Sequence, residues 1–373
     1  MRIDALYIHI PFCLRKCNYC DFVSFPRSGR EELFAAYPGL LEQELELWRR
    51  EADLTRISTV YFGGGTPSLL EPAAVGRLLG RLPAVRECTL EANPETVDLP
   101  RLAAFRQAGI DRLSLGVQSF DAELLRAMGR GHDGEQAARA VSLARQAGFD
   151  NISLDLIYGL PGQTVAQWRD SLERAAELSP EHISLYGLTI HENTPWGEAL
   201  AAGRLEAPDD DLAADMLELA LDFLPEQGFV QYEIANFARP GRESRHNCAY
   251  WQRDNYLGLG PAAASCLNDR RFANTPDPDR YAAAVRAGRH PIAEDETYAM
   301  EQVLGEAMFL GLRLTKGVDV SEYEQRYGVS PLRRFRHELK RLQKQGLIEY
   351  DDASIRLTRK GLLLGNLVFE QFV

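Results

Sequence analysis

The 373-residue sequence lacks several features that would assign it to a class at once. It contains no apolar run approaching the roughly 18–20 residues that a membrane-spanning helix needs. Its first residues, MRIDALYIHIPF, show no basic region ahead of a long apolar stretch, so they do not predict a secretory signal. We therefore expect a cytoplasmic protein without a transmembrane segment, and peripheral contact with a membrane is left open.

Basic side chains are also in deficit. The sequence has 42 lysines and arginines and 54 acidic residues, which gives a net charge of −12. Nucleic-acid binding relies on Lys and Arg to neutralise phosphates, so we expect no nucleic-acid partner. The segment 331–345 is basic, and a winged-helix nucleic-acid binder is the non-catalytic alternative. The overall acidity and the lack of a second basic face disfavour it.

Within this composition, short apolar runs alternate with helical patterns from residue 4 to about residue 230. The predicted strands are residues 5–10, 58–62, 87–92, 111–117, 151–159 and 182–188. The predicted helices are residues 30–51, 71–82, 98–108, 121–128, 134–147 and 164–178. Near-continuous apolar strands that alternate with amphipathic helices indicate a parallel sheet covered by helices.

Unusual polar residues and glycines gather at the carboxyl ends of these strands. Gly63–Thr66 follows the second strand and Gln118 the fourth, while Glu91 and Asp155 lie in the third and fifth. Barrels draw their active sites from many strands at that end, whereas an open sheet concentrates its site at one switch point. We therefore predict an α/β fold with a partial, TIM-like (β/α)6 barrel.

The pattern changes after residue 230. Residues 1–230 are predicted to form the barrel core. Residues 231–299 are rich in Asn, Arg, Asp and Pro without a clear period, and we expect a connecting segment. Residues 300–373 predict three helices, a hairpin at 347–358 and a final helix, an order that resembles a small winged-helix-like domain.

Cysteine is scarce, but three of the six cysteines fall within eight residues: Cys13, Cys17 and Cys20. This C-x3-C-x2-C spacing can bind three corners of a 4Fe–4S cluster and leave the fourth iron open for a ligand. Arg15 and Lys16 favour the thiolate forms of the cysteines. A zinc site is the alternative, but zinc normally takes four ligands and only His9 is nearby as a supplement.

The motif resembles that of the radical S-adenosylmethionine (SAM) superfamily, including the aromatic Tyr19 before the last cysteine. YIHIPFCLRKCNYCDF (7–22) and YFGGGTPSLL (61–70) resemble its HemN/HemW branch, the coproporphyrinogen oxidase-like proteins. The resemblance implies a radical SAM barrel in which Cys13, Cys17 and Cys20 hold a 4Fe–4S cluster whose open iron binds SAM.

A SAM pocket follows from the same resemblance. Successive glycines let a backbone approach a ligand closely, although a glycine run alone also suits a simple tight turn. SAM offers a sulfonium, an ammonium, a carboxylate and a ribose, which carboxylates, an arginine and an amide can bind. The positions that match SAM-contacting residues of the family are Tyr7, Gly64, Gly65, Thr66, Glu91, Gln118, Arg130 and Asp155.

Two differences from the oxidases help to decide to which branch of the family the chain is more similar. The oxidases carry a further cysteine where this chain has Phe22, and an N-terminal arm where this chain has six residues before Tyr7. HNCAYW (246–251) instead resembles the H-N-x-x-Y-W motif of the haem-chaperone branch. That resemblance implies haem binding by His246, Asn247, Tyr250 and Trp251, with Cys248 as a candidate second ligand. In the alternative interpretation, His246 is hydrogen-bonded internally and the aromatic residues pack a domain junction.

We therefore expect a haem chaperone that binds a 4Fe–4S cluster, SAM and haem, and that transfers haem to an acceptor protein of unknown identity. Oxygen-independent coproporphyrinogen III oxidation, a radical SAM decarboxylation, is the enzymatic alternative. Whether the chain is an enzyme is left open, with oxidase activity not expected.

The cysteine assignment predicts the outcome of a substitution. Replacing Cys13, Cys17 and Cys20 together with alanine is expected to abolish the cluster, because three of its irons lose their ligands. Iron and sulfide analysis with EPR of the anaerobically reconstituted protein measures the loss, and Cys266→Ala serves as the control. A cluster that survives the triple substitution contradicts the assignment.

Overall fold

A computed structural model describes residues 1–373, and its main feature is one curved, twelve-stranded sheet. Six consecutive strands of this sheet are parallel, in the order in which they follow one another along the chain. They are β1 (Ala5–Ile10), β4 (Thr59–Gly64), β5 (Glu87–Ala92), β6 (Arg112–Gln118), β7 (Ile152–Tyr158) and β8 (His182–Gly187). The predicted α/β fold with a partial barrel is confirmed.

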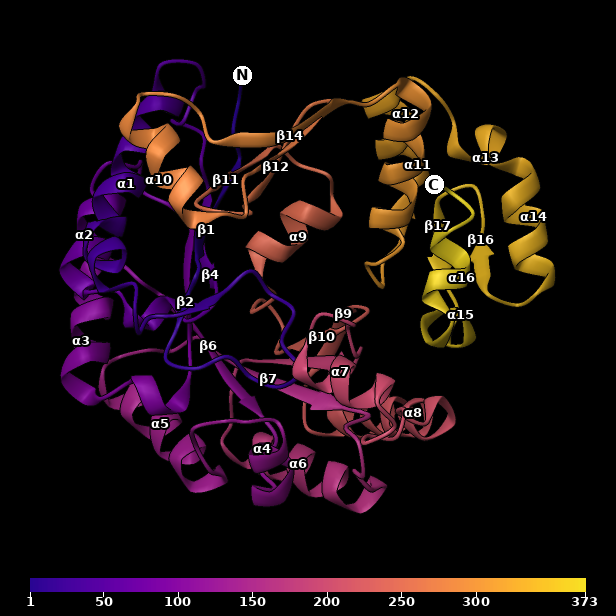
Figure 1. Cartoon of the computed structure of the whole chain (residues 1–373). Coiled ribbons are helices and arrows are strands. Elements are labelled where there is room, and N and C mark those ends of the chain that lie inside the picture. Colours follow the sequence, from indigo (N-terminus) through magenta and orange to yellow (C-terminus); the bar gives the residue numbers. More distant parts are fainter.

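Helices line the outer side of this sheet, as Figure 1 shows. Several start at a side-chain cap. Asp98 accepts a hydrogen bond from Arg101 N, and Asp133 and Thr164 each form a capping box. The helices are α1 (Glu31–Arg49), α2 (Pro72–Leu79), α3 (Leu99–Ala108), α4 (Ala122–Ala127), α5 (Gly134–Gln146), α6 (Val165–Glu177) and α8 (Asp210–Glu226). None of the helices is both long and apolar enough to span a membrane.

The two faces of the parallel strands differ in chemistry. Residues such as Leu6, Phe62 and Leu90 are fully buried in the main hydrophobic core. Their neighbours point to the opposite face, because side chains alternate along a strand, and there Tyr61 donates a hydrogen bond to Glu91. The inner face of the barrel is therefore polar, and this alternation brings titratable side chains together inside it.

Residues 231–299 extend the sheet beyond the parallel strands. After β9 (Val230–Glu233), β10 (Asn236–Ala238) pairs antiparallel with β8, and β11 (Tyr256–Leu259) pairs parallel with β1. The short strands β12 (Ala264–Leu267), β13 (Arg270–Asn274) and β14 (Ile292–Thr297) continue antiparallel from β11. This segment, expected as a connection, thus supplies strands to both ends of the sheet, together with α9 (Arg245–Trp251) and α10 (Pro278–Arg286).

The C-terminal residues form a second hydrophobic core of 16 buried residues. Four helices precede the hairpin and two follow it, where the sequence predicted three and one. The elements are α11 (Met300–Gly311), α12 (Val320–Tyr327), α13 (Pro331–Arg334), α14 (Arg336–Lys344), β16 (Ile348–Tyr350), β17 (Ser354–Leu357), α15 (Arg359–Leu363) and α16 (Gly365–Phe369), with β15 (Val318–Asp319) beside β17. Glu306 of α11 ties this part to the sheet, because it pairs with Arg253 and Arg271 at 2.7 Å each.

A buried carboxyl group on α1 holds the antiparallel extension in place. Glu44 is fully buried and accepts hydrogen bonds from Gly260 N at 2.8 Å, Asn274 Nδ2 at 2.6 Å and Tyr281 Oη at 2.7 Å. Its burial raises its pKa to about 7. One side chain therefore joins α1 to the residue after β11, to β13 and to α10.

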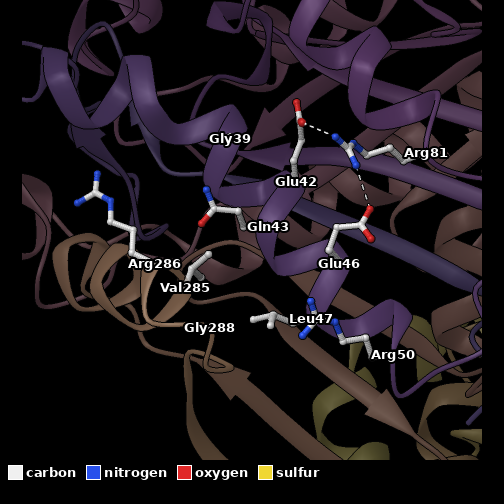
Figure 2. A pocket seen from close by; sticks show the side chains of 10 residues that line it. All are labelled: Gly39, Glu42, Gln43, Glu46, Leu47, Arg50, Arg81, Val285, Arg286 and Gly288. Carbon is white, nitrogen blue, oxygen red and sulfur yellow. Dashed lines mark hydrogen bonds and ion pairs between the residues drawn. The ribbon is translucent and has the colours of Figure 1, made fainter.

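The outer face of α1 carries carboxylates in a different setting. Figure 2 shows a hollow between α1 and α10 in which Arg81 pairs with Glu42 and Glu46, both at 2.9 Å. The arginine and Glu46 are well exposed, and exposed ion pairs contribute only about 0–1 kcal/mol. The hollow has few apolar side chains and no cysteine, and it lies away from the carboxyl ends of the barrel strands.

The buried position of Glu44 and the more exposed position of Glu42 predict different losses in the free energy of unfolding when each glutamate is replaced by alanine. Glu44→Ala is expected to lower the free energy of unfolding by about 2–4 kcal/mol, because it leaves buried donors unpaired. Glu42→Ala, on the same helix, should cost less than about 1 kcal/mol. Urea titrations of both variants and of the wild type measure the difference.

The same titrations at several pH values add a second readout. The ordinary pKa of a glutamate is 4.5 and that of native Glu44 is about 7, so the native state holds a proton that the unfolded chain has released between these values. The contribution of Glu44 to stability is therefore complete below pH 4.5 and is lost as the pH rises towards 7. The difference in the free energy of unfolding between the wild type and Glu44→Ala should therefore become smaller as the pH rises over that range. If Glu44→Ala and Glu42→Ala lower the free energy of unfolding equally, the structural role assigned to Glu44 is wrong.

Candidate cluster and cofactor site

A cavity of about 470 Å³ opens at the carboxyl ends of the parallel strands. The cysteine loop and the glycine loop after β4 form its walls, together with the ends of β5, β6, β7 and β8. The predicted residues that line it are Cys13, Cys17, Cys20, Gly64, Gly65, Thr66, Glu91, Gln118, Arg130 and Asp155. Residues from six separate segments of the chain therefore meet at one place.

The cysteine loop lies between two short strands, β2 (Phe12–Cys13) and β3 (Phe25–Pro26). Asn18 anchors it, because its backbone N–H donates to Met128 O at 3.0 Å and its side chain donates to Ala127 O at 2.8 Å. All three thiols are half-buried and free. Burial raises the pKa of Cys20 to about 11 and also raises that of Cys13, so binding of a metal centre must displace protons from these thiols.

The arrangement of the thiols suits a multi-iron cluster better than a single ion. Ligands of one Zn²⁺ each lie about 2.3 Å from the metal, so their sulfur atoms must converge closely. No three cysteine, histidine or carboxylate side chains converge in that way in this chain. A four-iron cluster instead binds each cysteine through a different iron, and three thiols spread around one cavity fit that requirement.

The glycine loop packs directly against the cysteine strand. Gly65 N donates to Ile10 O and Thr66 N donates to Phe12 O, each at 2.8 Å. A Cβ atom at Gly65 would lie 2.7 Å from Phe12 O and 2.9 Å from Cys13 Sγ. Only glycine permits this approach, so the loop and the first cysteine hold each other in place.

Two carboxylates face the cavity from β5 and β7, the strands on either side of β6. Glu91 accepts from Tyr61 Oη at 2.8 Å and from Gly64 N at 3.1 Å, and Asp155 accepts from Ser114 Oγ at 3.0 Å. Burial raises the pKa of Glu91 to about 7 and also raises that of Asp155. A cationic ligand beside these groups would favour their charged forms, which suits the ammonium and sulfonium of SAM.

Arg130 reaches the cavity from the loop after α4. Its guanidinium donates to Asn93 Oδ1 and to Gly116 O, both at 2.6 Å, and lies 3.6 Å from Cys17 Sγ. Its Nε is buried without a partner. The unsatisfied donor and the thiol contact both favour a ligand-binding role over a surface position for this arginine.

Tyr7 and His9 lie beneath the glycine loop, and Tyr7 does not line the cavity. The hydroxyl of Tyr7 is 3.0 Å from His9 Nδ1, and His9 Nε2 is 2.8 Å from Val23 O. Both ring nitrogens of His9 are thus engaged, so the imidazole is unavailable as a metal ligand. The zinc alternative thereby loses the fourth ligand that the sequence offered.

Three further residues complete the site and were not predicted: Tyr61, Asn93 and Ser114. Each contacts a predicted residue. Asn93 accepts a hydrogen bond from Arg130, and Tyr61 and Ser114 donate hydrogen bonds to the carboxylates of Glu91 and Asp155, respectively. The signal was present as the period of two in a strand, because Asn93 follows Glu91 by two positions and so shares its face.

The HNCAYW motif lies at the other end of the barrel. It forms α9, whose first backbone N–H groups, of Arg245 and His246, donate to the carboxylate of Glu87 at 3.0 Å each. Glu87 is the first residue of β5, and Thr59, which contacts His246, is the first residue of β4. Because these strands are parallel, α9 and the cysteine loop occupy opposite ends, and the two sets of predicted residues are separated.

The imidazole of His246 is enclosed in this position. It is 1% exposed, with Nδ1 at 2.9 Å from Thr59 Oγ1 and Nε2 at 2.8 Å from Tyr250 Oη. Burial lowers its pKa to about 3. Ligation of haem iron by His246 therefore stays a prediction, and it requires one of these hydrogen bonds to break.

The other members of the motif face different surroundings. The ring of Trp251 packs under the guanidinium of Arg313, 4.2 Å from the ring centre, at the boundary with the C-terminal helices. Asn247 and Cys248 are half-buried. This geometry corresponds to the alternative interpretation, in which the motif packs a domain junction.

Comparison with known proteins identifies both parts of the chain. The model of the radical SAM superfamily matches residues 7–175, and that of the HemN C-terminal domain matches residues 299–364. The heme chaperone HemW of Bacillus subtilis is 35% identical over 378 residues, covering 100% of this chain and 99% of that protein. A mitochondrial protein of Bos taurus, radical S-adenosyl methionine domain-containing protein 1, is 36% identical and covers 96% of this chain and 84% of its own length.

A solved structure agrees with these matches over the whole chain. The structure of coproporphyrinogen III oxidase (HemN) from Escherichia coli, described as a radical SAM enzyme, superposes with a TM-score of 0.84 at 27% identity. The match covers 100% of this chain and 90% of that one. The resemblance inferred from the cysteine and glycine motifs is confirmed.

The packing of the glycine loop predicts the effect of one methyl group. Gly65→Ala is expected to displace Cys13 or the loop, and so to reduce the iron and sulfide content of the anaerobically reconstituted protein at least severalfold. Gly76→Ala in α2 is the matched control, since its added Cβ would make only ordinary contact at 3.5 Å. Equal cluster content in the two variants would show that the close approach at Gly65 has no importance for the cluster.

Proposed function

The chain belongs to the HemN/HemW family of radical SAM proteins, and on this basis we propose that it is a haem chaperone that binds a 4Fe–4S cluster, SAM and haem. It would pass the haem to an acceptor protein in the cytoplasm. The observation that carries the proposal is full-length similarity to haem chaperones at 35% identity, together with a cavity lined by three cysteines.

The residues of the cavity fit the two resident cofactors. Cys13, Cys17 and Cys20 would bind the cluster, and the backbone of Gly64 and Gly65 would face the methionine part of SAM. Glu91 and Asp155 would balance the positive charges of SAM, and Arg130 would attract its carboxylate. When bound to the open iron of such a cluster, SAM can supply a 5′-deoxyadenosyl radical.

A second candidate function, coproporphyrinogen III oxidation, is favoured by the close structural match to HemN. Phe22 disfavours oxidase activity, because this chain has a phenylalanine where the oxidase motif has a further cysteine. The ring of Phe22 is exposed at the edge of the cavity, so the position offers an apolar surface where the oxidase offers a thiol.

Titration of the anaerobically reconstituted protein with hemin tests the chaperone function. We expect saturation at one haem per chain, with a shift of the Soret band, because axial ligation changes the electronic state of the iron. Iron-free protoporphyrin IX is the control, since it has the same shape and offers no axial coordination. Failure to bind hemin in an equimolar amount would remove the chaperone proposal.

Incubation of the same sample with SAM, a reductant and coproporphyrinogen III tests the oxidase function. We expect no protoporphyrinogen IX. Turnover to that product would replace the chaperone proposal with the enzymatic one.

A further inference from the structure

Three large apolar side chains are exposed around the mouth of the cysteine-lined cavity. Leu14, Phe22 and Tyr186 are 51%, 60% and 45% exposed, respectively. Phe22 and Tyr186 line the cavity, and Leu14 stands between Cys13 and Arg15, which also line it. Single exposed apolar residues are common, but several around one opening indicate a binding surface for an apolar ligand.

Two cations accompany this apolar rim. Arg15 and Lys16 are exposed and line the same opening, although the chain as a whole carries a net charge of −12. A ligand that matches both features has a broad apolar face and peripheral negative charges. Haem has this composition, since its macrocycle is flat and apolar and its propionates are anionic.

An imidazole lies at the same rim. His191 lines the cavity, its side chain is 46% exposed, and its Nε2 is 3.3 Å from the carboxylate of Asp21. A histidine that binds a metal usually donates its second ring N–H to a carboxylate, a backbone carbonyl or a water molecule, which orients the ring and makes it a stronger ligand. Asp21 lies within ion-pair distance of Nε2, where a carboxylate could orient the ring, and the Nδ1 edge of the ring is left for iron.

Hydrogen bonds and ring packing hold the loop that carries His191 against the cysteine loop. Thr194 donates to His191 O through its hydroxyl at 2.7 Å, and caps α7 (Pro195–Ala201). Trp196 N donates to Asn18 O at 2.9 Å, and its ring lies 5.9 Å from that of Tyr19. The imidazole therefore has a defined position relative to the cavity mouth.

The other six histidines of the chain lack this combination. His9, His132, His182 and His246 are buried, and both nitrogens of each ring have hydrogen-bonding partners. His290 packs against Trp48 and pairs with Glu51, away from the cavity. His337 is exposed on α14 in the C-terminal domain.

We propose that His191, oriented by Asp21, is an axial ligand of a haem bound over the mouth of the cavity, an inference that rests on the proposed chaperone function. Phe22 and Tyr186 contact the porphyrin, and Arg15 and Lys16 face the propionates. The haem lies outside Gly64, Gly65 and Glu91, so cluster and SAM remain bound beneath it. Binding at this site leaves α9 and the hydrogen bonds of His246 undisturbed.

Hemin titration of the full chain, reconstituted with its cluster, tests the assignment by absorbance and by EPR of the ferric haem. His191→Ala is expected to weaken binding by at least about tenfold and to remove the histidine-ligated spectrum, which added imidazole restores. Asp21→Asn should weaken binding by roughly tenfold while the spectrum stays that of a histidine complex, because Asp21 only positions the ring. His337→Ala should resemble the wild type, and cluster content reports whether each variant is folded.

The outcomes separate this inference from the function on which it depends. If the wild type binds no hemin, the chaperone proposal fails, and the assignment of His191 fails with it. If the wild type binds hemin and His191→Ala has the same affinity and spectrum, or if His246→Ala alone loses the histidine signature, the assignment of His191 is overturned and the chaperone proposal stands. His191→Met, which keeps a side chain of similar bulk, must also change the ligand signature, so a poorly folded alanine variant does not prevent the test.

Discussion

The close approach of the glycine loop to the cysteine strand is the contact on which the candidate site depends. Gly65 N and Thr66 N bond to carbonyls of residues 10–12, and there is no room for a side chain between Gly65 and Cys13. Because β1 and β4 are adjacent parallel strands, their carboxyl ends already meet, and the hydrogen bonds extend that pairing past the end of the sheet. The thiols, the carboxylates of β5 and β7, and Arg130 are thereby held around one cavity.

The barrel is closed at one end and open at the other. Glu87 binds the first turn of α9, and His246 fits among Thr59, Tyr61 and Tyr250, so α9 covers the amino ends of the strands. Buried polar atoms without partners occur at both ends, Arg112 Nε and Trp251 Nε1 near the amino ends and Arg130 Nε at the carboxyl ends. Apolar rings are in addition exposed at the carboxyl ends. Exposed apolar surface is unfavourable without a ligand, so this surface favours ligand binding at the open end.

Much of the fold could be predicted because its signals are local. The strand and helix bounds of residues 5–187 follow from apolar runs, caps and glycines, each within a few neighbouring residues. Residues 231–299 gave no such signal, since short antiparallel strands such as β12 and β13 have only four or five residues and pair with distant partners. Glu44 illustrates the same limit: a glutamate in an amphipathic helix predicts a solvated face, and only its three partners from residues 260–281 explain its burial.

The amino-acid sequence by itself determined the family, the barrel, and the residue types that surround a cluster and SAM, because spacing such as C-x3-C-x2-C and the order of strands are properties of the chain. It could not decide which histidine is accessible to a ligand. His246 stands in the more distinctive motif but is enclosed by Thr59 and Tyr250, whereas His191 stands in no motif and lies at the cavity mouth beside Asp21. Only the tertiary structure decides this, since the exposure of an imidazole and the partners of its nitrogens depend on residues far away in the sequence.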